Sequence, residues 1–166
     1  MAQPHGHDHA HDHAHEALGL TGRALAAELQ TAEASCLADG QKLTPARRRV
    51  LELLMRAGQP MKAYDLISAF SEGDDSPAKP PTVYRALEFL ERQGLAHRIE
   101  SLSAYVACLK GRGGHAAAFL ICDCCGKTVE VEAAVGEALM SVAAQSGYAV
   151  QSVAIEAHGR CAACRA

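Results

Sequence analysis

The chain has 166 residues, 49% of them hydrophobic, and a formal net charge of −3. This length suits one large domain or two small ones, with buried cores. The sequence has no run of about 18 uncharged apolar residues and no N-terminal secretion signal, so we expect a cytoplasmic protein without a membrane span.

The charge is divided unevenly along the chain. Residues 1–41 hold one Arg against six acids (−5), residues 42–98 ten Lys or Arg against seven acids (+3), and residues 99–166 five against six (−1). A mildly basic middle block is weak evidence for nucleic-acid binding by itself.

Residues 1–16 form a His-rich tail that we expect to be disordered. They hold six of the nine histidines, on every second position from His5 to His15. Such a composition cannot build a core, whereas imidazoles at this density bind Zn²⁺, Ni²⁺ or Cu²⁺ loosely. The tail could scavenge metal, bind it incidentally, or be an expression tag.

The next part of the sequence predicts a winged helix. Thr44 and Pro45 are an N-cap and a first helical residue, and Gly58 ends the same helix. Helices are predicted at residues 17–38, 45–57, 63–70 and 81–93. Two alternating segments, 95–100 and 104–109, predict a hairpin. The last three helices with the hairpin make the winged helix, whose third helix enters the major groove of DNA.

The C-terminal part predicts a small mixed module. Its strands are expected at residues 117–121, 128–132 and 149–157, with a helix at 133–146. Leu139, Met140 and Val142 are available for burial on that helix, and Gly147 suits its C-terminal cap. The order β-β-α-β predicts an α+β unit with one exposed edge for dimer pairing. The fold class is therefore α+β, a winged-helix domain followed by a small C-terminal α/β dimerisation domain.

The cysteines give the strongest chemical signal. Cys122, Cys125, Cys161 and Cys164 form two CxxC pairs, which predict a closed tetrahedral zinc site of structural type. Redox-active dithiols are the alternative. Among the remaining cysteines, Cys124 is interpreted as a bystander, and Cys36 is expected to be a small buried apolar residue.

A second set of ligand-type residues surrounds the predicted hairpin. His97, Cys108, His115 and Glu130 offer one thiolate, two imidazoles and one carboxylate, which could close a tetrahedron around Zn²⁺. The thiolate disfavours Mn²⁺, Mg²⁺ and Fe²⁺. Each residue also has an ordinary interpretation, as a hairpin His, a buried Cys or a surface Glu.

Several segments resemble the ferric-uptake-regulator (Fur) family, and within it the zinc-responsive members. The resemblance covers about residues 25–164 and rests on LTPARRRVLELL, on AYDL at 63–66, on KPPTVYRALEFLERQGLAHRIES at 79–101 and on the terminal IEAHGRCAAC. It implies a homodimeric repressor that binds double-stranded operator DNA when zinc is plentiful and represses zinc-acquisition genes.

The resemblance also implies roles for individual residues. The four cysteines of the CxxC pairs match a structural zinc site, and His97, Cys108, His115 and Glu130 match a regulatory zinc site. Tyr64 and Arg85 match positions that contact bases, with Thr82 and Tyr84 beside them. The corresponding domains are residues 17–109 for DNA binding, 110–114 as a hinge, and 115–166 for dimerisation and metal binding.

Three other functions are alternatives. An iron- or peroxide-responsive regulator of the same family is disfavoured by Cys108, because thiolate ligation favours zinc. A zinc buffer built on the His-rich tail is a second alternative. A zinc enzyme would need an open metal position and a general base, and the sequence has no HExxH arrangement. We therefore expect neither catalysis nor a small-molecule substrate.

Overall fold

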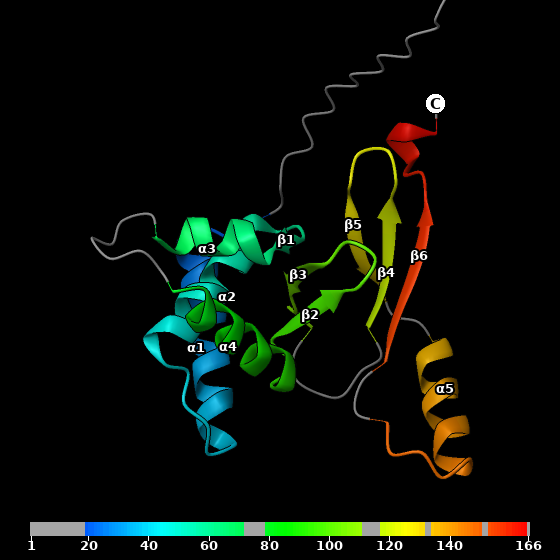
Figure 1. The fold of residues 1–166 in the computed structure, drawn as a ribbon, viewed down its shortest axis with the longest axis horizontal. Helices are drawn as coiled ribbons and strands as arrows, with labels where there is room; N and C mark the ends of the chain where they lie inside the picture. The colour runs from blue at the N-terminus through cyan, green and yellow to red at the C-terminus, as the bar shows by residue number, and fades with distance from the viewer. Residues whose placement is uncertain (1–18, 72–78, 111–116, 132–133, 151–152, 166) are drawn as a thin grey trace, which may run out of the picture.

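The computed structural model describes residues 19–71, 79–110, 117–131, 134–150 and 153–165, which fall into two halves (Figure 1). The N-terminal half contains α1 (Gly22–Ala38), α2 (Pro45–Ala57), β1 (Met61–Lys62), α3 (Ala63–Ser71), α4 (Pro80–Arg92), β2 (Ala96–Ile99) and β3 (Ala104–Ala107). The C-terminal half contains β4 (Ala117–Cys122), β5 (Thr128–Val131), α5 (Ala134–Gln145), β6 (Ala154–Gly159) and the short 3₁₀ helix η1 (Ala162–Cys164). None of the helices in these ranges is long and apolar enough to cross a membrane.

The core of the N-terminal half is formed by apolar stripes at helical spacing. On α2, Val50, Leu51 and Leu54 are fully buried, and they pack in one cluster with Leu87 and Leu90 of α4. Full burial of such a side chain stabilises the fold by ~1.5–3 kcal/mol, so this stripe orients α4 firmly. The predicted winged helix is confirmed.

Helix α1 contributes to the same core. Its buried residues Leu25, Leu29, Ala32 and Cys36 recur at intervals of three or four residues, which places them on one helical face. Cys36 is completely buried, as expected for a small apolar residue.

Two local details of this half concern α2 and the hairpin. Thr44 is the N-cap residue of α2, as predicted; its side chain makes no capping hydrogen bond, while its carbonyl accepts the first helical hydrogen bond, from Arg48 N at 2.9 Å. The hairpin also gains a third strand, because Met61 and Lys62 pair with β3 to give the order β1-β3-β2. Two residues are too few for strand periodicity to predict them.

The C-terminal sheet has the order β5-β4-β6, with β5 antiparallel and β6 parallel to β4. The expectation of one exposed edge is wrong, because β5 and β6 each have a neighbour on one side only in the sheet described. The final strand also begins later than predicted, at Ala154.

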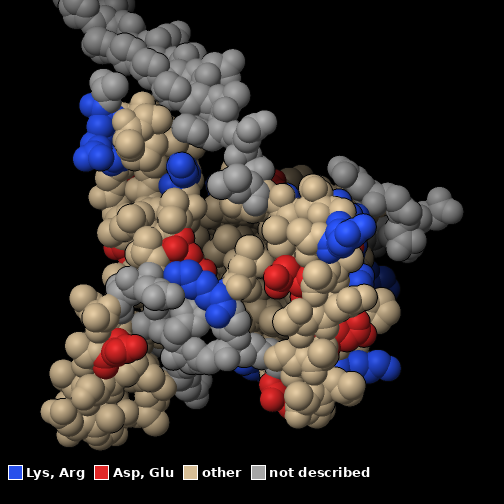
Figure 2. All heavy atoms as spheres, turned by 180° about the vertical axis from the view of Figure 1, so that it is seen from behind, with Lys and Arg blue, Asp and Glu red and all other residues tan. Residues whose placement is uncertain are grey.

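Helix α5 lies apart from the sheet (Figure 1) and is largely uncovered in the single chain. Val135, Leu139 and Val142 are 65%, 50% and 57% exposed, so the expected burial of its apolar residues is wrong for one chain. In Figure 2 the helix lies at the lower left, where its surface shows one acidic patch and is otherwise tan. Exposed apolar side chains gathered in this way are typical of an interface with another chain.

The two halves meet where the β2–β3 hairpin, hereafter the wing, packs on the C-terminal sheet. A small core contains Ile99 from the wing with Ala117, Phe119 and Ile121 from β4. Ile99 is fully buried and Phe119 is 1% exposed. The wing is therefore shared, because it belongs to the N-terminal half and also covers one face of the C-terminal sheet.

Candidate metal centres and nucleic-acid interface

The two CxxC pairs meet because the strands that carry them run parallel. β4 ends at Cys122, and the register pairs this residue with Gly159, two residues before Cys161. Asp123 N donates to Gly159 O at 2.8 Å and extends the pairing into the first CxxC turn. Parallel strands place their carboxyl ends at the same end of the sheet, and each CxxC pair lies at the carboxyl end of one of these strands.

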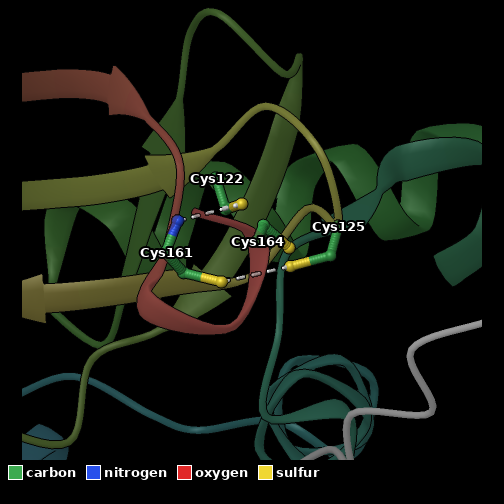
Figure 3. A group of neighbouring side chains, drawn as sticks. All are labelled: Cys122, Cys125, Cys161 and Cys164. Atoms are coloured by element: carbon green, nitrogen blue, oxygen red, sulfur yellow. Dashed lines mark hydrogen bonds between the residues drawn. The ribbon is translucent and has the colours of Figure 1, made fainter. Parts of the chain in front are cut away.

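Each pair forms a tight turn. Gly126 N donates to Cys122 O at 2.9 Å, and Gly126 has a φ of +73°, a conformation that favours glycine. The second pair closes through Cys164 N, which donates to Cys161 O at 2.9 Å. Figure 3 shows the four cysteine side chains pointing toward one another.

The four sulfur atoms form one compact group. All lie within 4.8 Å of one another, and Cys125 Sγ is 3.8 Å from Cys161 Sγ (Figure 3). A tetrahedral site with Zn–S bonds of ~2.3 Å separates its sulfurs by about 3.8 Å. The group therefore fits zinc. Such a site is closed when all four positions are taken by the protein, and it contributes folding energy.

Backbone hydrogen bonds favour the thiolate form of one of the four cysteines, Cys122. Cys161 N donates to Cys122 Sγ at 3.3 Å, and this backbone hydrogen bond lowers the pKa of Cys122 to about 6. Burial, followed by the neighbouring cysteines, raises the pKa of Cys164. For Cys125, the backbone hydrogen bond from Lys127 lowers the pKa, but burial and nearby thiols outweigh it and the pKa is raised. A divalent cation would supply the positive charge that lets all four ionise.

A second group of ligand-type atoms bridges the two halves. His97, Cys108 and Glu130 each offer one atom, and these atoms lie within 4.8 Å of one another. His97 is on β2 and Cys108 follows β3, whereas Glu130 is on β5. Imidazole nitrogen, thiolate sulfur and carboxylate oxygen suit Zn²⁺, and three such ligands leave a fourth position.

Local structure fixes each member of this group, hereafter the bridging group. Strand pairing sets His97 opposite Val106, and Cys108 N donates to Leu95 O at 3.0 Å. Cys108 is only 5% exposed. The His97 ring meets Phe119 edge to face, with ring centroids 5.7 Å apart. The wing thus presents an imidazole and a thiol to β5 from a fixed backbone.

Several predicted features lie outside the described residues or outside these groups. His115, the His-rich tail at 1–16 and residues 111–114 of the predicted hinge fall outside the described ranges. Cys124 is exposed and does not join the four-sulfur group. His158 bonds Asp123, with Nδ1 2.9 Å from Oδ1, and joins neither group.

The residues predicted to contact DNA are all exposed. Thr82, Tyr84 and Arg85 are exposed on the first turns of α4, whose opposite face is buried through Val83 and Leu87. Tyr64 on α3 is 77% exposed. Arg can bond guanine through two hydrogen bonds, and Tyr can contact phosphate or a thymine methyl group.

The arginines of α2 make contacts within the N-terminal half. Arg47 Nη1 donates to Lys42 O at 2.6 Å, and its guanidinium lies 3.6 Å from the centroid of the buried Phe89 ring. Arg49 and Arg56 pair with Glu52. The basic cluster at 47–49 is therefore partly engaged in holding α2 and α4.

One polar residue that sequence reasoning left out lies between the halves. The Glu156 carboxylate on β6 accepts from Glu100 N at 2.7 Å and from Ser101 N at 3.2 Å, both in the turn of the wing. Burial raises the Glu156 pKa, but these hydrogen bonds, with that of the Ser101 side chain, outweigh it and the pKa is lowered. Only the alternation along β6 could have indicated it, because a lone acidic residue carries no motif.

Comparisons with known proteins give one consistent result. Residues 38–158 match the family model described as "Ferric uptake regulator family". The chain is 44% identical over 139 residues to the zinc uptake regulation protein of Escherichia coli K12, covering 82% of this chain and 80% of the relative.

Three solved structures of zinc uptake regulators are similar in fold. A regulator complexed with zinc and DNA has a TM-score of 0.78 at 40% identity, over 87% of this chain and 97% of that one. Holo XcZur has a TM-score of 0.74 at 41% identity, over 84% and 97% of the two chains. Apo XcZur, at the same 41% identity and over 86% and 98%, has a TM-score of only 0.50. At equal sequence similarity, the arrangement of this chain is closer to the holo form.

Proposed function

We propose that this chain, which belongs to the ferric uptake regulator family, is a zinc-responsive transcriptional repressor that binds operator DNA as a homodimer. It binds DNA when zinc is bound and represses zinc uptake genes. The observation that carries this proposal is the bridging group, because its ligand atoms come from both halves of the molecule. The similarity to a regulator complexed with zinc and DNA supports it.

The proposed division of the chain follows from these roles. Residues 17–109 bind DNA, 110–114 act as a hinge, 115–166 provide dimerisation and metal binding, and the His-rich tail at 1–16 lies outside the family resemblance. The exposed apolar face of α5 supports a dimer contact in the C-terminal domain. A repressor acts where the chromosome lies, so the proposed location is the cytoplasm.

We assign different roles to the two proposed zinc sites. Cys122, Cys125, Cys161 and Cys164 hold a structural zinc, since all four come from one end of one sheet. His97, Cys108 and Glu130, with His115 as the fourth ligand, hold the regulatory zinc. Zinc bound there would supply a link between the wing and β5.

The physical consequence is a fixed orientation of α4, the helix proposed to enter the major groove. With His97 and Cys108 held against Glu130, the wing stays on the sheet, and α4 keeps one angle to the dimerisation domain. A dimer then presents two α4 helices at a spacing suited to successive major grooves, where Tyr64 and Arg85 contact bases. A coupling of ~1–3 kcal/mol would change DNA affinity roughly 5- to 150-fold.

The proposal is tested by DNA binding across a buffered zinc series. The probe is a duplex selected from random-sequence DNA by the zinc-loaded full-length protein. Binding should rise with free zinc in the wild type and lose its zinc response in Cys108→Ser, while the variant stays dimeric. Cys124→Ser, which removes an exposed thiol outside both groups, is the matched control. A normal zinc response in Cys108→Ser would refute the regulatory assignment.

Two further arms separate the remaining candidates. Iron(II) in place of zinc tests the iron-responsive alternative, which Cys108 disfavours because thiolates prefer zinc. Deletion of residues 1–16 tests a zinc buffer built on the tail. A repressor keeps its zinc-dependent DNA binding without the tail, whereas a buffer loses its zinc capacity.

A further inference from the structure

Three residues in one row of the C-terminal sheet contribute to holding the wing. The register pairs Phe119 of β4 with Glu130 of β5 on one side and with Glu156 of β6 on the other. Residues paired across neighbouring strands project from the same face of a sheet. Phe119 packs against the wing, so Glu130 and Glu156 flank the wing at the two edges of the sheet.

The two edges hold the wing by different chemistry. At the β5 edge, Glu130 meets His97 and Cys108 in the bridging group. At the β6 edge, Glu156 accepts hydrogen bonds from the backbone N–H groups of Glu100 and Ser101 through its two oxygens. The second attachment needs no metal, and hydrogen bonds to a carboxylate are stronger than those between neutral groups.

The Glu156 carboxylate also lies close to the imidazole of His158, on the same strand. His158 Nε2 lies 3.8 Å from Glu156 Oε2, and His158 Nδ1 lies 2.9 Å from Asp123 Oδ1. Asp123 belongs to the first CxxC turn. The carboxylate therefore points at the wing from a supported position, and its side chain is only 15% exposed.

We propose that Glu156 is a positioning residue that sets the zinc concentration at which the protein responds, by docking the wing from the β6 edge. This inference rests on the proposed function. Both attachments form fully only when the wing lies on the sheet, so each favours the other. Loss of the Glu156 attachment should therefore weaken zinc binding at the bridging group, although Glu156 and Glu130 lie on opposite sides of Phe119.

The test uses full-length protein with Glu156→Gln and Glu156→Ala. The Gln side chain keeps the size of Glu and one acceptor oxygen, but its NH₂ group faces one of the two backbone N–H donors. The Ala side chain has no acceptor. Amide NMR signals of Cys108, Glu100 and Ser101 are followed across a buffered zinc series. The free zinc concentration that half-saturates the bridging group should be about tenfold higher in Glu156→Gln than in the wild type, because charge-assisted hydrogen bonds are lost. It should be higher still in Glu156→Ala, because these hydrogen bonds are lost in both variants.

The matched control removes a charge from the same turn without touching the backbone donors. The Glu100 side chain is 67% exposed and pairs with Arg98, so Glu100→Gln should leave the zinc midpoint unchanged. DNA binding with the selected duplex should shift in parallel with the NMR midpoint. Wild-type DNA binding in the same series tests the proposed function separately, because the NMR midpoint requires no DNA.

Two outcomes would overturn the inference. An unchanged zinc midpoint in both Glu156 variants would show that the attachment does not affect zinc binding. Loss of the dimer or of the cysteine-bound zinc in both variants would show that Glu156 is needed for folding. Retention of both, with a shifted midpoint and altered Glu100 and Ser101 amides, is the expected result.

Discussion

The two candidate metal centres differ in their ligand types and are assembled from different parts of the fold. The four cysteines lie at one end of one sheet, where backbone hydrogen bonds set both CxxC turns. The bridging group takes His97 and Cys108 from the wing and Glu130 from β5. A site inside one unit can contribute only to the stability of that unit, whereas a site shared by two units can also control their orientation.

The difference in location also predicts a difference in ease of metal loss. Opening the cysteine group requires the two CxxC turns, which a backbone hydrogen bond from Asp123 N to Gly159 O joins, to separate. Opening the bridging group requires only that the wing leave the sheet, which breaks the small core around Phe119 and the hydrogen bonds of Glu156. Partial opening of this kind costs less free energy than global unfolding.

The largest expected effect comes from breaking the cysteine group. Cys161→Ser removes a proposed zinc ligand, whose Sγ lies 3.8 Å from Cys125 Sγ. Since structural zinc contributes ~10–16 kcal/mol in zinc-finger peptides, the variant should lose its dimer and its ordered C-terminal sheet. Size-exclusion chromatography and zinc content measure this, with Cys124→Ser as control. A stable, zinc-replete dimer of Cys161→Ser would refute the structural role.

Mild chelation should separate the two centres without a substitution. A chelator in excess should remove the metal of the bridging group first and leave about one zinc per chain in the cysteine group. DNA binding should be lost at that stage and return when zinc is added. Metal analysis alongside gel shifts follows both quantities. Simultaneous loss of all zinc would contradict the proposed division of roles.

Substitution of a residue proposed to contact bases should leave both candidate metal centres intact. Arg85→Ala should weaken binding to the selected duplex by ~1–3 kcal/mol, as loss of a base contact does, with no change in zinc content. Arg92→Ala is the control on the same helix, because Arg92 is in the last turn and pairs with Glu88. Equal losses in the two variants would show that Arg85 contributes only general charge.

The smallest expected effect concerns the link between the cysteine group and Glu156. The hydrogen bond that His158 donates to the Asp123 carboxylate is the main cause that raises the pKa of His158, with the Asp123 and Glu156 charges adding to it. Protonated His158 therefore stabilises the fold fully below pH 6.5, and this contribution is lost as pH rises through the raised pKa. Asp123→Asn should return the pKa toward its usual value.

NMR titration of the His158 ring in zinc-loaded protein measures this shift. Glu156→Gln should lower the same pKa by a smaller amount, because its charge contributes less than the Asp123 hydrogen bond. If His158 titrates identically in wild type and Asp123→Asn, the contact does not form in solution.

Much of the fold could be predicted because local patterns were strong. The apolar spacing of Val50, Leu51 and Leu54 and the alternation of the hairpin predicted the winged helix, and Gly58 and Gly147 marked helix ends. Helix α5 was predicted with the right position and the wrong burial. Periodicity shows that an apolar face exists, but not whether the covering surface belongs to the same chain.

The candidate sites also differ in how far local sequence patterns could predict them. CxxC spacing alone grouped the four cysteines, because a short turn fixes the distance between its two thiols. His97, Cys108 and Glu130 could be named as ligand types, but their spacing along the chain says nothing about strand pairing. Glu156 was not predicted at all, since its partners are backbone N–H groups more than fifty residues away.

The sequence by itself determined the helices, the turns and the chemical character of each ligand, because these depend on residues within a few positions of one another. Only the tertiary structure decided that β6 runs parallel to β4, which aligns the two CxxC pairs and places Glu130, Phe119 and Glu156 in one row. Strand order and register arise from the packing of distant segments. That packing makes the wing a part of both halves, and the proposed zinc response depends on it.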